Sequence, residues 1–245
     1  MSEEFVENLE LEEDDSIDDF VEKLEELKKF LKEKNRDSLL PFLEAYLRIT
    51  RDVREFSEEG EFDDPEALER LDLEFGRLYL EPMKKYLAKG EKQEPWENYF
   101  EYVEQEDSIP LLELALGINA HINADLATAI ERTDYRNRED FEKINKILRK
   151  NLRPVLVHLA VKHRDPTSFG VLGVPPLALK GLGRVREWRD FTWRNARSPD
   201  FSVEEVNKKT EFNAGEMIEL VHRKDLAGIL KKPRQVIETR VSVTQ

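Results

Sequence analysis

The sequence contains no cysteine, which excludes disulfide bonds, thiolate metal ligands and cysteine nucleophiles. It also lacks an uninterrupted apolar run of about 18 residues, so no transmembrane helix is expected. No basic segment followed by an apolar stretch opens the chain, and such a pattern would indicate a signal peptide. We therefore expect a cytoplasmic protein. The 245 residues, 39% of them hydrophobic, are enough to build one sizeable core.

Basic residues are fewer than acidic ones, with 39 Lys and Arg against 53 Asp and Glu, which argues against a general nucleic-acid-binding protein. The excess is concentrated at the N-terminus, because residues 1–20 contain ten acids and no base. Like charges repel and few apolar residues oppose them, so we expect residues 1–15 to form a disordered acidic tail. The alternative is an acidic docking segment anchored by Phe5, Val6, Leu9 and Leu11.

Apolar residues recur at helical spacing through most of the chain, which predicts an all-α protein. The Ser16–Asp19 pair predicts one capped helix start, and Asp64 followed by Pro65 predicts another. We find no internal repeat and no alternation of strands with helices. The simplest architecture is a single domain of about eight to ten helices over residues 16–245.

Residues 165–183 differ in character from the rest, because they are apolar and rich in glycine and proline. A stretch of this kind predicts a long loop that acts as a lid over a ligand or docks a partner. We expect the helices to resume near Arg184. Just before this stretch, His158 lies within an apolar run, which predicts a buried core histidine.

Residues 111–130 read LLELALGINAHINADLATAI and predict a buried central helix at about 109–131, since both of its faces are apolar. His121 and Asp125 share one face of this helix, and Asn119 and Asn123 share roughly the opposite one. Each buried polar group then needs a partner, because leaving one unsatisfied costs about 1–3 kcal/mol.

Three interpretations of His121 and Asp125 follow. The pair can belong to a structural polar network that fixes the helix register. It can supply two ligands to a divalent metal, since residues at i and i+4 reach one ion from a helix face. It can also act as a general base, with Asp125 orienting the imidazole of His121. A metal would need further ligands, and the sequence holds only three other histidines, so the cofactor stays open.

Residues 117–126 read GINAHINADL, which resembles the marker G-x-N-A-H-I-N-x-D-L of an uncharacterised prokaryotic all-helical family of unknown function. Residues 61–65, 71–79 and 189–196 also resemble segments of that family in the same order. Gly76 and Thr192 depart from the family pattern, which has alanine at both places. The resemblance implies an all-helical fold and suggests that the four segments meet in space, but it supplies no reaction.

We therefore predict a polar pocket beside the central helix that binds a small or lipid-like molecule, with hydrolysis as the reaction if the protein is an enzyme. His121 would be the base or a metal ligand, Asp125 its orienting group or a second ligand, and Arg189 the clamp for an anion. The candidate ligand-binding residues are Asn119, Asn123, Asp64, Tyr79 and Trp193. The alternative is a non-catalytic interaction or scaffold protein in which the His, Asn and Asp network is structural. The oligomeric state stays open.

Overall fold

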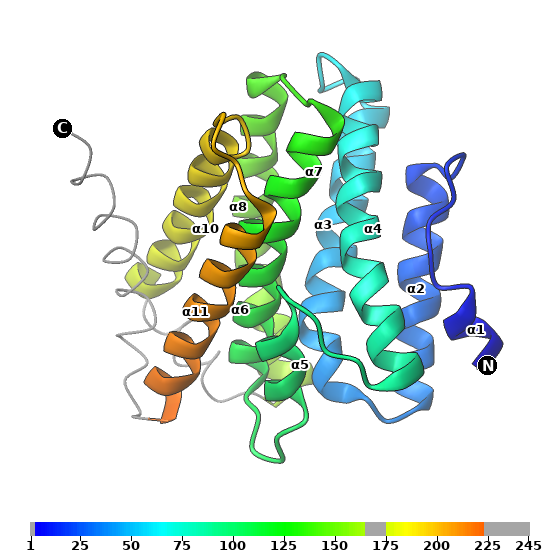
Figure 1. Cartoon of the computed structure of the whole chain (residues 1–245), viewed down its shortest axis with the longest axis vertical. Helices are drawn as coiled ribbons and strands as arrows, with labels where there is room; N and C mark the ends of the chain where they lie inside the picture. The colour runs from blue at the N-terminus through cyan, green and yellow to red at the C-terminus, as the bar shows by residue number, and fades with distance from the viewer. Residues whose placement is uncertain (1–2, 165–174, 223–245) are drawn as a thin grey trace.

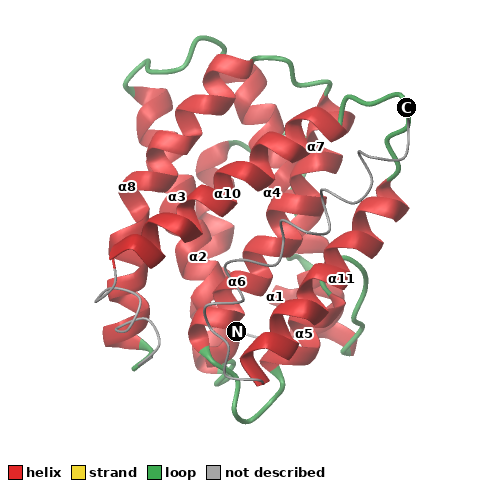
Figure 2. Ribbon diagram, turned by 90° about the vertical axis from the view of Figure 1, so that its left-hand side faces the viewer, coloured by secondary structure: helices red, strands yellow, loops and turns green. Residues whose placement is uncertain are grey.

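Helical elements make up all the regular structure of the described residues, which in this computed structural model are 3–164 and 175–222 (Figures 1 and 2). The prediction of a single all-α domain is confirmed. The elements in chain order are α1 (Glu3–Glu7), α2 (Ile17–Glu33), the 3₁₀ turn η1 (Asp37–Leu39), α3 (Leu40–Glu58), α4 (Pro65–Lys89), α5 (Glu97–Val103), α6 (Pro110–Ala120), the π-helical turn η2 (His121–Asp125), α7 (Leu126–Thr133), α8 (Arg138–Lys162), α10 (Pro175–Asn195) and α11 (Val203–His222).

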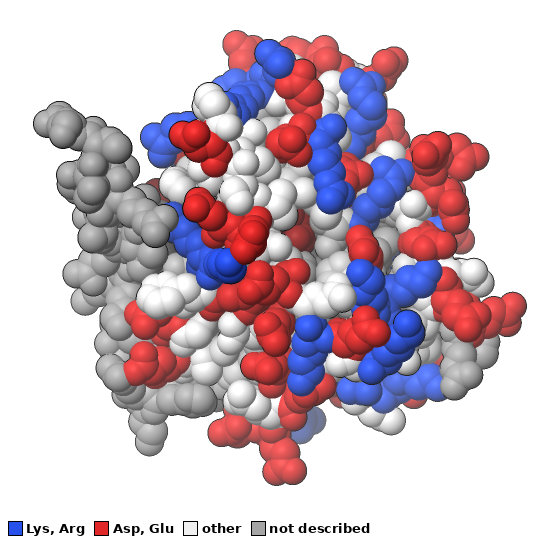
Figure 3. Space-filling model, viewed as in Figure 1, with Lys and Arg blue, Asp and Glu red and all other residues white. Residues whose placement is uncertain are grey.

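The two predicted helix starts are confirmed by their hydrogen bonds. Ser16 and Asp19 form a reciprocal capping box at the start of α2. The Asp64 side chain accepts a hydrogen bond from the backbone N–H of Ala67, and Pro65 occupies the first position of α4. None of the helices within 3–164 and 175–222 is long and apolar enough to cross a membrane. Acidic and basic side chains are interspersed over the face shown in Figure 3.

The predicted central helix is confirmed as a continuous column formed by α6, η2 and α7. In Figure 1 this column runs through the middle of the bundle. It contacts α3, α4 and α5 as well as α10 and α11, so it is buried by helices from both halves of the chain. The widened π turn at its centre, residues 121–125, was not predicted, and it carries both His121 and Asp125.

Two glycines let aromatic rings lie directly on a helix backbone. A Cβ atom on Gly117 would fall 2.4 Å from Cγ of Phe42, and one on Gly76 would fall 2.5 Å from Cζ of Phe20. The first contact sets α3 against α6, and the second sets α2 against α4. The need for space at Phe20 gives a physical reason for glycine rather than alanine at position 76.

The acidic N-terminal segment, expected to be disordered, lies against the domain instead. Val6, Leu9 and Leu11 are buried, and α1 contacts α4. Arg77 donates hydrogen bonds to the backbone carbonyls of Leu11 and Glu12. Burial of the apolar anchors and the pairing of Arg77 with the segment outweigh the like-charge repulsion on which the expectation was based.

The segment predicted as a loop over 165–183 is partly helical. The helix α10 begins at Pro175, nine residues before the predicted start, and residues 165–174 lie outside the described residues. Proline is tolerated in the first turn of a helix because its missing N–H has no intrahelical partner there. The Leu, Ala and Lys residues that follow favour a helix, so this expectation was wrong for residues 175–183.

Asp140 joins the start of α8 to the turn before α4. Its side chain is fully buried and accepts hydrogen bonds from the backbone N–H groups of Asp63 and Asp64 at 2.9 and 2.8 Å, and from Lys143 at 2.8 Å. Burial alone would raise the pKa of Asp140, but the bonds from Lys143 and from the two backbone N–H groups outweigh it and lower that pKa.

We expect Gly117→Ala to destabilise the fold. Alanine is the better helix former by about 1 kcal/mol, but overpacking of a core costs about 1–3 kcal/mol, and the new Cβ would lie 2.4 Å from the buried Phe42 ring. The net loss of unfolding free energy should be up to about 2 kcal/mol in urea titrations. Gly215→Ala in α11 is the matched control: its Cβ would meet no atom within 4 Å, so the same change should be neutral or stabilising.

We expect Asp140→Asn to reduce the free energy of unfolding by about 1–3 kcal/mol at pH 7, because backbone donors lose a charged acceptor. The pKa of Asp140 is lowered in the folded state, so its contribution is present above pH 4 and is lost as the pH falls below that value. The difference between wild type and variant should therefore shrink from pH 7 to pH 3. Asp107→Asn, at an exposed position, is the control; a deficit that does not change with pH would contradict this account.

Candidate functional site

His121 and Asp125 form a buried pair at the centre of the molecule. Nδ1 of His121 lies 3.0 Å from Oδ2 of Asp125, and each residue is only 3% exposed. Both belong to η2, so the i, i+4 spacing brings the two side chains together as predicted. The close contact of imidazole and carboxylate is compatible with a structural network and with a general base.

Trp96 contacts Asp125 of this pair, and it was not identified as a site residue from the sequence. Its indole Nε1–H donates to Asp125 at 3.1 Å from Oδ2 and 3.4 Å from Oδ1, and its side chain is fully buried. Trp96 lies at the N-terminal cap of α5, 29 positions from Asp125. No local spacing links the two residues, so only the packing of α5 against α6 reveals the contact.

Burial governs the protonation of the pair. It lowers the pKa of the His121 imidazole, and it raises the pKa of the Asp125 carboxyl against the opposing hydrogen bond from Trp96. When Asp125 is ionised, the indole N–H of Trp96 and Nδ1–H of a neutral His121 both donate to its carboxylate. The imidazole then carries its free lone pair on Nε2, as a general base requires.

Aromatic rings surround His121. Its imidazole stacks on Phe75 with a centroid separation of 3.5 Å, and Tyr46 approaches it edge-on at 4.4 Å. The rings of Phe42, Tyr79 and Trp96 lie between 5.5 and 6.1 Å from it. These walls make the surroundings apolar, which explains the direction of both pKa shifts.

Three side chains around Phe42 each carry a buried polar atom that has no hydrogen-bond partner among the described residues. These atoms are Nε2 of His121 and the hydroxyl oxygens of Tyr79 and Tyr99. The ring of Phe42 lies 5.5, 5.3 and 6.3 Å from the rings of these residues, so all three surround one side chain. Burial raises the pKa of both tyrosines, which therefore keep their hydroxyl protons. Tyr79 was a predicted site residue, whereas Tyr99 was not.

The predicted ligand residues Asn119 and Asn123 are used within the fold. Nδ2 of Asn119 donates to the carbonyl of Thr210 in α11 at 2.9 Å, and Nδ2 of Asn123 donates to Oδ1 of Asn119 at 3.0 Å. In the same region the hydroxyl of Thr192 in α10 donates to the carbonyl of Ile122 at 2.9 Å. These bonds tie the central column to α10 and α11. They also give Thr192 a role that alanine would lack.

The structure places Arg189 and Trp193 beside Phe141 rather than beside Asp125. The Arg189 guanidinium donates to the carbonyl of Phe141 at 3.0 Å and lies 4.1 Å from the centroid of its ring. Trp193 packs on the same ring with a centroid separation of 4.6 Å. The predicted site residues therefore do not form one site. Asp64 lies apart from His121 as well, at the cap of α4 beside Asp140.

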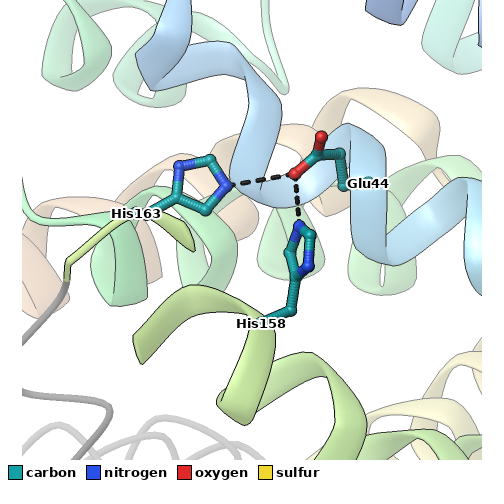
Figure 4. Close-up of side chains that lie close together, drawn as sticks. All are labelled: Glu44, His158 and His163. Atoms are coloured by element: carbon teal, nitrogen blue, oxygen red, sulfur yellow. Dashed lines mark hydrogen bonds and ion pairs between the residues drawn. The ribbon is translucent and has the colours of Figure 1, made fainter. Parts of the chain in front are cut away.

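Metal-ligating side chains gather away from the central column. In the part of the chain that the structure describes, His121 and Asp125 are not joined by a third His, Asp or Glu ligand, whereas Glu44, His158 and His163 form such a group (Figure 4). The prediction that His158 is a core histidine was wrong, because its side chain is 44% exposed and bonded to Glu44. Val157 and Val161, on the same side of α8, are also exposed, at 41% and 66%.

We expect Trp96→Phe to destabilise the protein by about 1–3 kcal/mol at pH 8, because a buried carboxylate loses a donor. Without that donor the pKa of Asp125, already raised by burial, rises further. The deficit should therefore be largest at high pH and should narrow as the pH falls and the carboxyl is protonated. Trp193→Phe is the control, because it makes the same change in ring size beside Phe141, away from Asp125. Equal deficits for both variants across pH 5–8 would contradict the assigned role of Trp96.

Comparison with known proteins places the chain in a family without assigning it a reaction. No curated protein and no solved structure matches the chain significantly. A family model described as a family of unknown function, DUF5995, matches residues 17–221. This range includes α2 to α8, α10 and nearly all of α11, and with them the His121–Asp125 pair and the Glu44, His158 and His163 group. The chain therefore belongs to this family of unknown function.

Proposed function

We propose that the protein binds a small, neutral and largely apolar molecule beside His121, and that His121 acts on it as a general base. The observation that supports this proposal is that three side chains packed around Phe42 each carry a buried polar atom without a partner: Nε2 of His121 and the hydroxyls of Tyr79 and Tyr99. A buried polar atom left without a partner costs about 1–3 kcal/mol, so a ligand that supplies the missing hydrogen bonds gains that energy on binding.

The chemistry of the surroundings limits the ligand. A hydroxyl group of the ligand would donate to Nε2 of His121, and a carbonyl or ether oxygen would accept from the hydroxyls of Tyr79 and Tyr99. The aromatic walls favour an apolar body. A charged ligand is disfavoured, because its transfer into this buried region would cost far more than the available hydrogen bonds return.

The same arrangement suits ester hydrolysis. Nε2 of His121 would take a proton from the water that attacks the acyl carbon, while Asp125 holds the imidazole through Nδ1. The same nitrogen would return the proton to the alcohol oxygen as its bond to the acyl carbon breaks. The tyrosine hydroxyls would donate to the carbonyl oxygen as its negative charge develops. Because His121 is only 3% exposed, the ligand must enter through a local opening. The seven-residue helix α5 carries Tyr99 and is preceded by Trp96, so its displacement would expose the site.

A non-catalytic role is the second candidate, and separate hydrogen bonds favour it. Asn119 binds the carbonyl of Thr210, and Thr192 binds the carbonyl of Ile122, so polar groups of the central column fix its position against α10 and α11. In that case the His121–Asp125 pair would also act as a structural element that sets helix register. The two candidate functions predict different stabilities for variants that lack the hydroxyl of Tyr79 or of Tyr99.

We expect Tyr79→Phe and Tyr99→Phe to leave stability unchanged or to raise it by up to about 1 kcal/mol, because each removes a buried hydroxyl that lacks a partner. Tyr102→Phe is the control: the Tyr102 hydroxyl accepts a hydrogen bond from the N–H of Ile109 at 3.0 Å, so its loss should cost about 1 kcal/mol. Thermal and urea unfolding would measure both effects. Losses at Tyr79 and Tyr99 as large as at Tyr102 would favour the structural role.

Binding is tested with β-naphthol, a neutral aromatic molecule with one hydroxyl, by calorimetry on the full chain. The wild type should bind it, and Tyr79→Phe, Tyr99→Phe and His121→Phe should bind it at least several-fold more weakly. Mass spectrometry of organic extracts of the purified protein would identify a natural ligand. Equal heats in the wild type and in all three variants would overturn the assignment of this site.

A further inference from the structure

Three potential metal ligands from two helices converge at one edge of the bundle. Glu44 lies on α3, His158 lies on α8, and His163 is the residue at the C-terminal cap of α8. Both imidazoles present Nε2 to the same carboxylate oxygen, Oε2 of Glu44, at 2.6 Å for His158 and 3.1 Å for His163 (Figure 4). The three ligand atoms lie within 4.8 Å of one another.

This donor set is one of those that zinc uses at open sites. Two imidazole nitrogens and one carboxylate oxygen bind Zn²⁺ in a tetrahedral arrangement whose fourth position is held by water or a substrate. With zinc–ligand bonds of about 2.0–2.1 Å, tetrahedral ligand atoms lie about 3.3 Å apart. The distances from Oε2 to the two nitrogens are already close to that separation and need to open by less than about 1 Å. We propose that Glu44, His158 and His163 form a Zn²⁺ site that links α3 to α8.

The exposure of the three side chains fits a site with a buried floor and an open entrance. The side chains of Glu44 and His163 are 8% and 9% exposed, whereas that of His158 is 44% exposed. A cation can therefore arrive on the His158 side, and the fourth position faces solvent. Among the described residues no other group of three such ligands competes for the ion.

Two lysines occupy the other carboxylate oxygen. Lys162 forms a close ion pair with Oε1 of Glu44, and Nζ of Lys32 lies 3.4 Å from the same atom. This division leaves Oε2 to the imidazoles, so Glu44 would bind zinc through one oxygen while Oε1 keeps its lysine partner. Both lysines also repel a cation. They are 38% and 42% exposed, so both side chains can move away from an arriving ion.

The spacing of the histidines explains why the sequence did not reveal this group. Residues five apart lie about 140° from each other around an ideal helix, because each residue turns the chain by about 100°. His163 leaves the helical path at the cap, with φ −90° and ψ 3°, and this change lets both imidazoles reach Glu44. The carboxylate comes from a helix more than 110 positions away.

The test is a titration of the tag-free, full-length chain with Zn²⁺ by calorimetry, accompanied by elemental analysis of protein purified without chelator. We expect one zinc per chain, with binding at least tenfold weaker in His158→Gln and in His163→Gln. Lys162→Gln should bind zinc roughly two- to tenfold more tightly, because a competing cation is removed from Glu44. Lys146→Gln, on an exposed part of α8, makes the same change in charge as Lys162→Gln and should bind zinc as the wild type does.

Two further readouts distinguish this site from non-specific binding. Bound Co²⁺ should give the visible absorption of a tetrahedral centre in the wild type and lose it in His158→Gln. Zinc should raise the melting temperature of the wild type but not that of His158→Gln, because only the folded chain presents the site. His158 is exposed, so this variant should remain folded, and circular dichroism would verify it. Zinc binding of equal strength in the wild type and in both histidine variants would overturn the proposal, as would the absence of binding to the wild type.

Discussion

The contact of the Phe42 ring with the backbone of Gly117 is the constraint on which the centre of the molecule depends. It lets α3 lie directly against α6, at a distance that any side chain at position 117 would prevent. From that position the ring contacts Tyr79, Trp96 and His121 as well. A single close approach therefore gathers the rings of α4, of the segment before α5 and of the central column around one point.

The chemistry of the centre follows from this packing. Aromatic rings exclude water from His121 and Asp125, so both groups are shifted toward their neutral forms, and the donor on Trp96 opposes that shift at Asp125. The polar groups on the opposite face of the column bond to α10 and α11 instead. The column thus joins a structural network on one face to a set of unpartnered polar atoms on the other.

The helix α3 takes part in both proposed sites because residues two positions apart on a helix point to nearly opposite sides. Phe42 and Tyr46 point toward His121, while Glu44, two positions from each, meets His158 and His163 of α8. Two residues turn a helix by about 200°, so this division is a direct consequence of helical geometry. The buried pair and the partly exposed metal-ligating group therefore lie on different faces of α3, so a ligand can bind at either site independently of the other.

The sequence by itself determined the helical class, the caps of α2 and α4, and the buried central column with His121 and Asp125 on one face. These features depend on residues within a few positions of one another, where helical periodicity and capping chemistry act directly. Tertiary structure alone decided which distant side chains meet. Trp96 binds Asp125, Tyr99 packs against Phe42, and Glu44 binds His158. Arg189 and Trp193 lie beside Phe141 instead. Helical spacing sets the face that a residue occupies, but only the packing of whole helices sets what lies opposite that face.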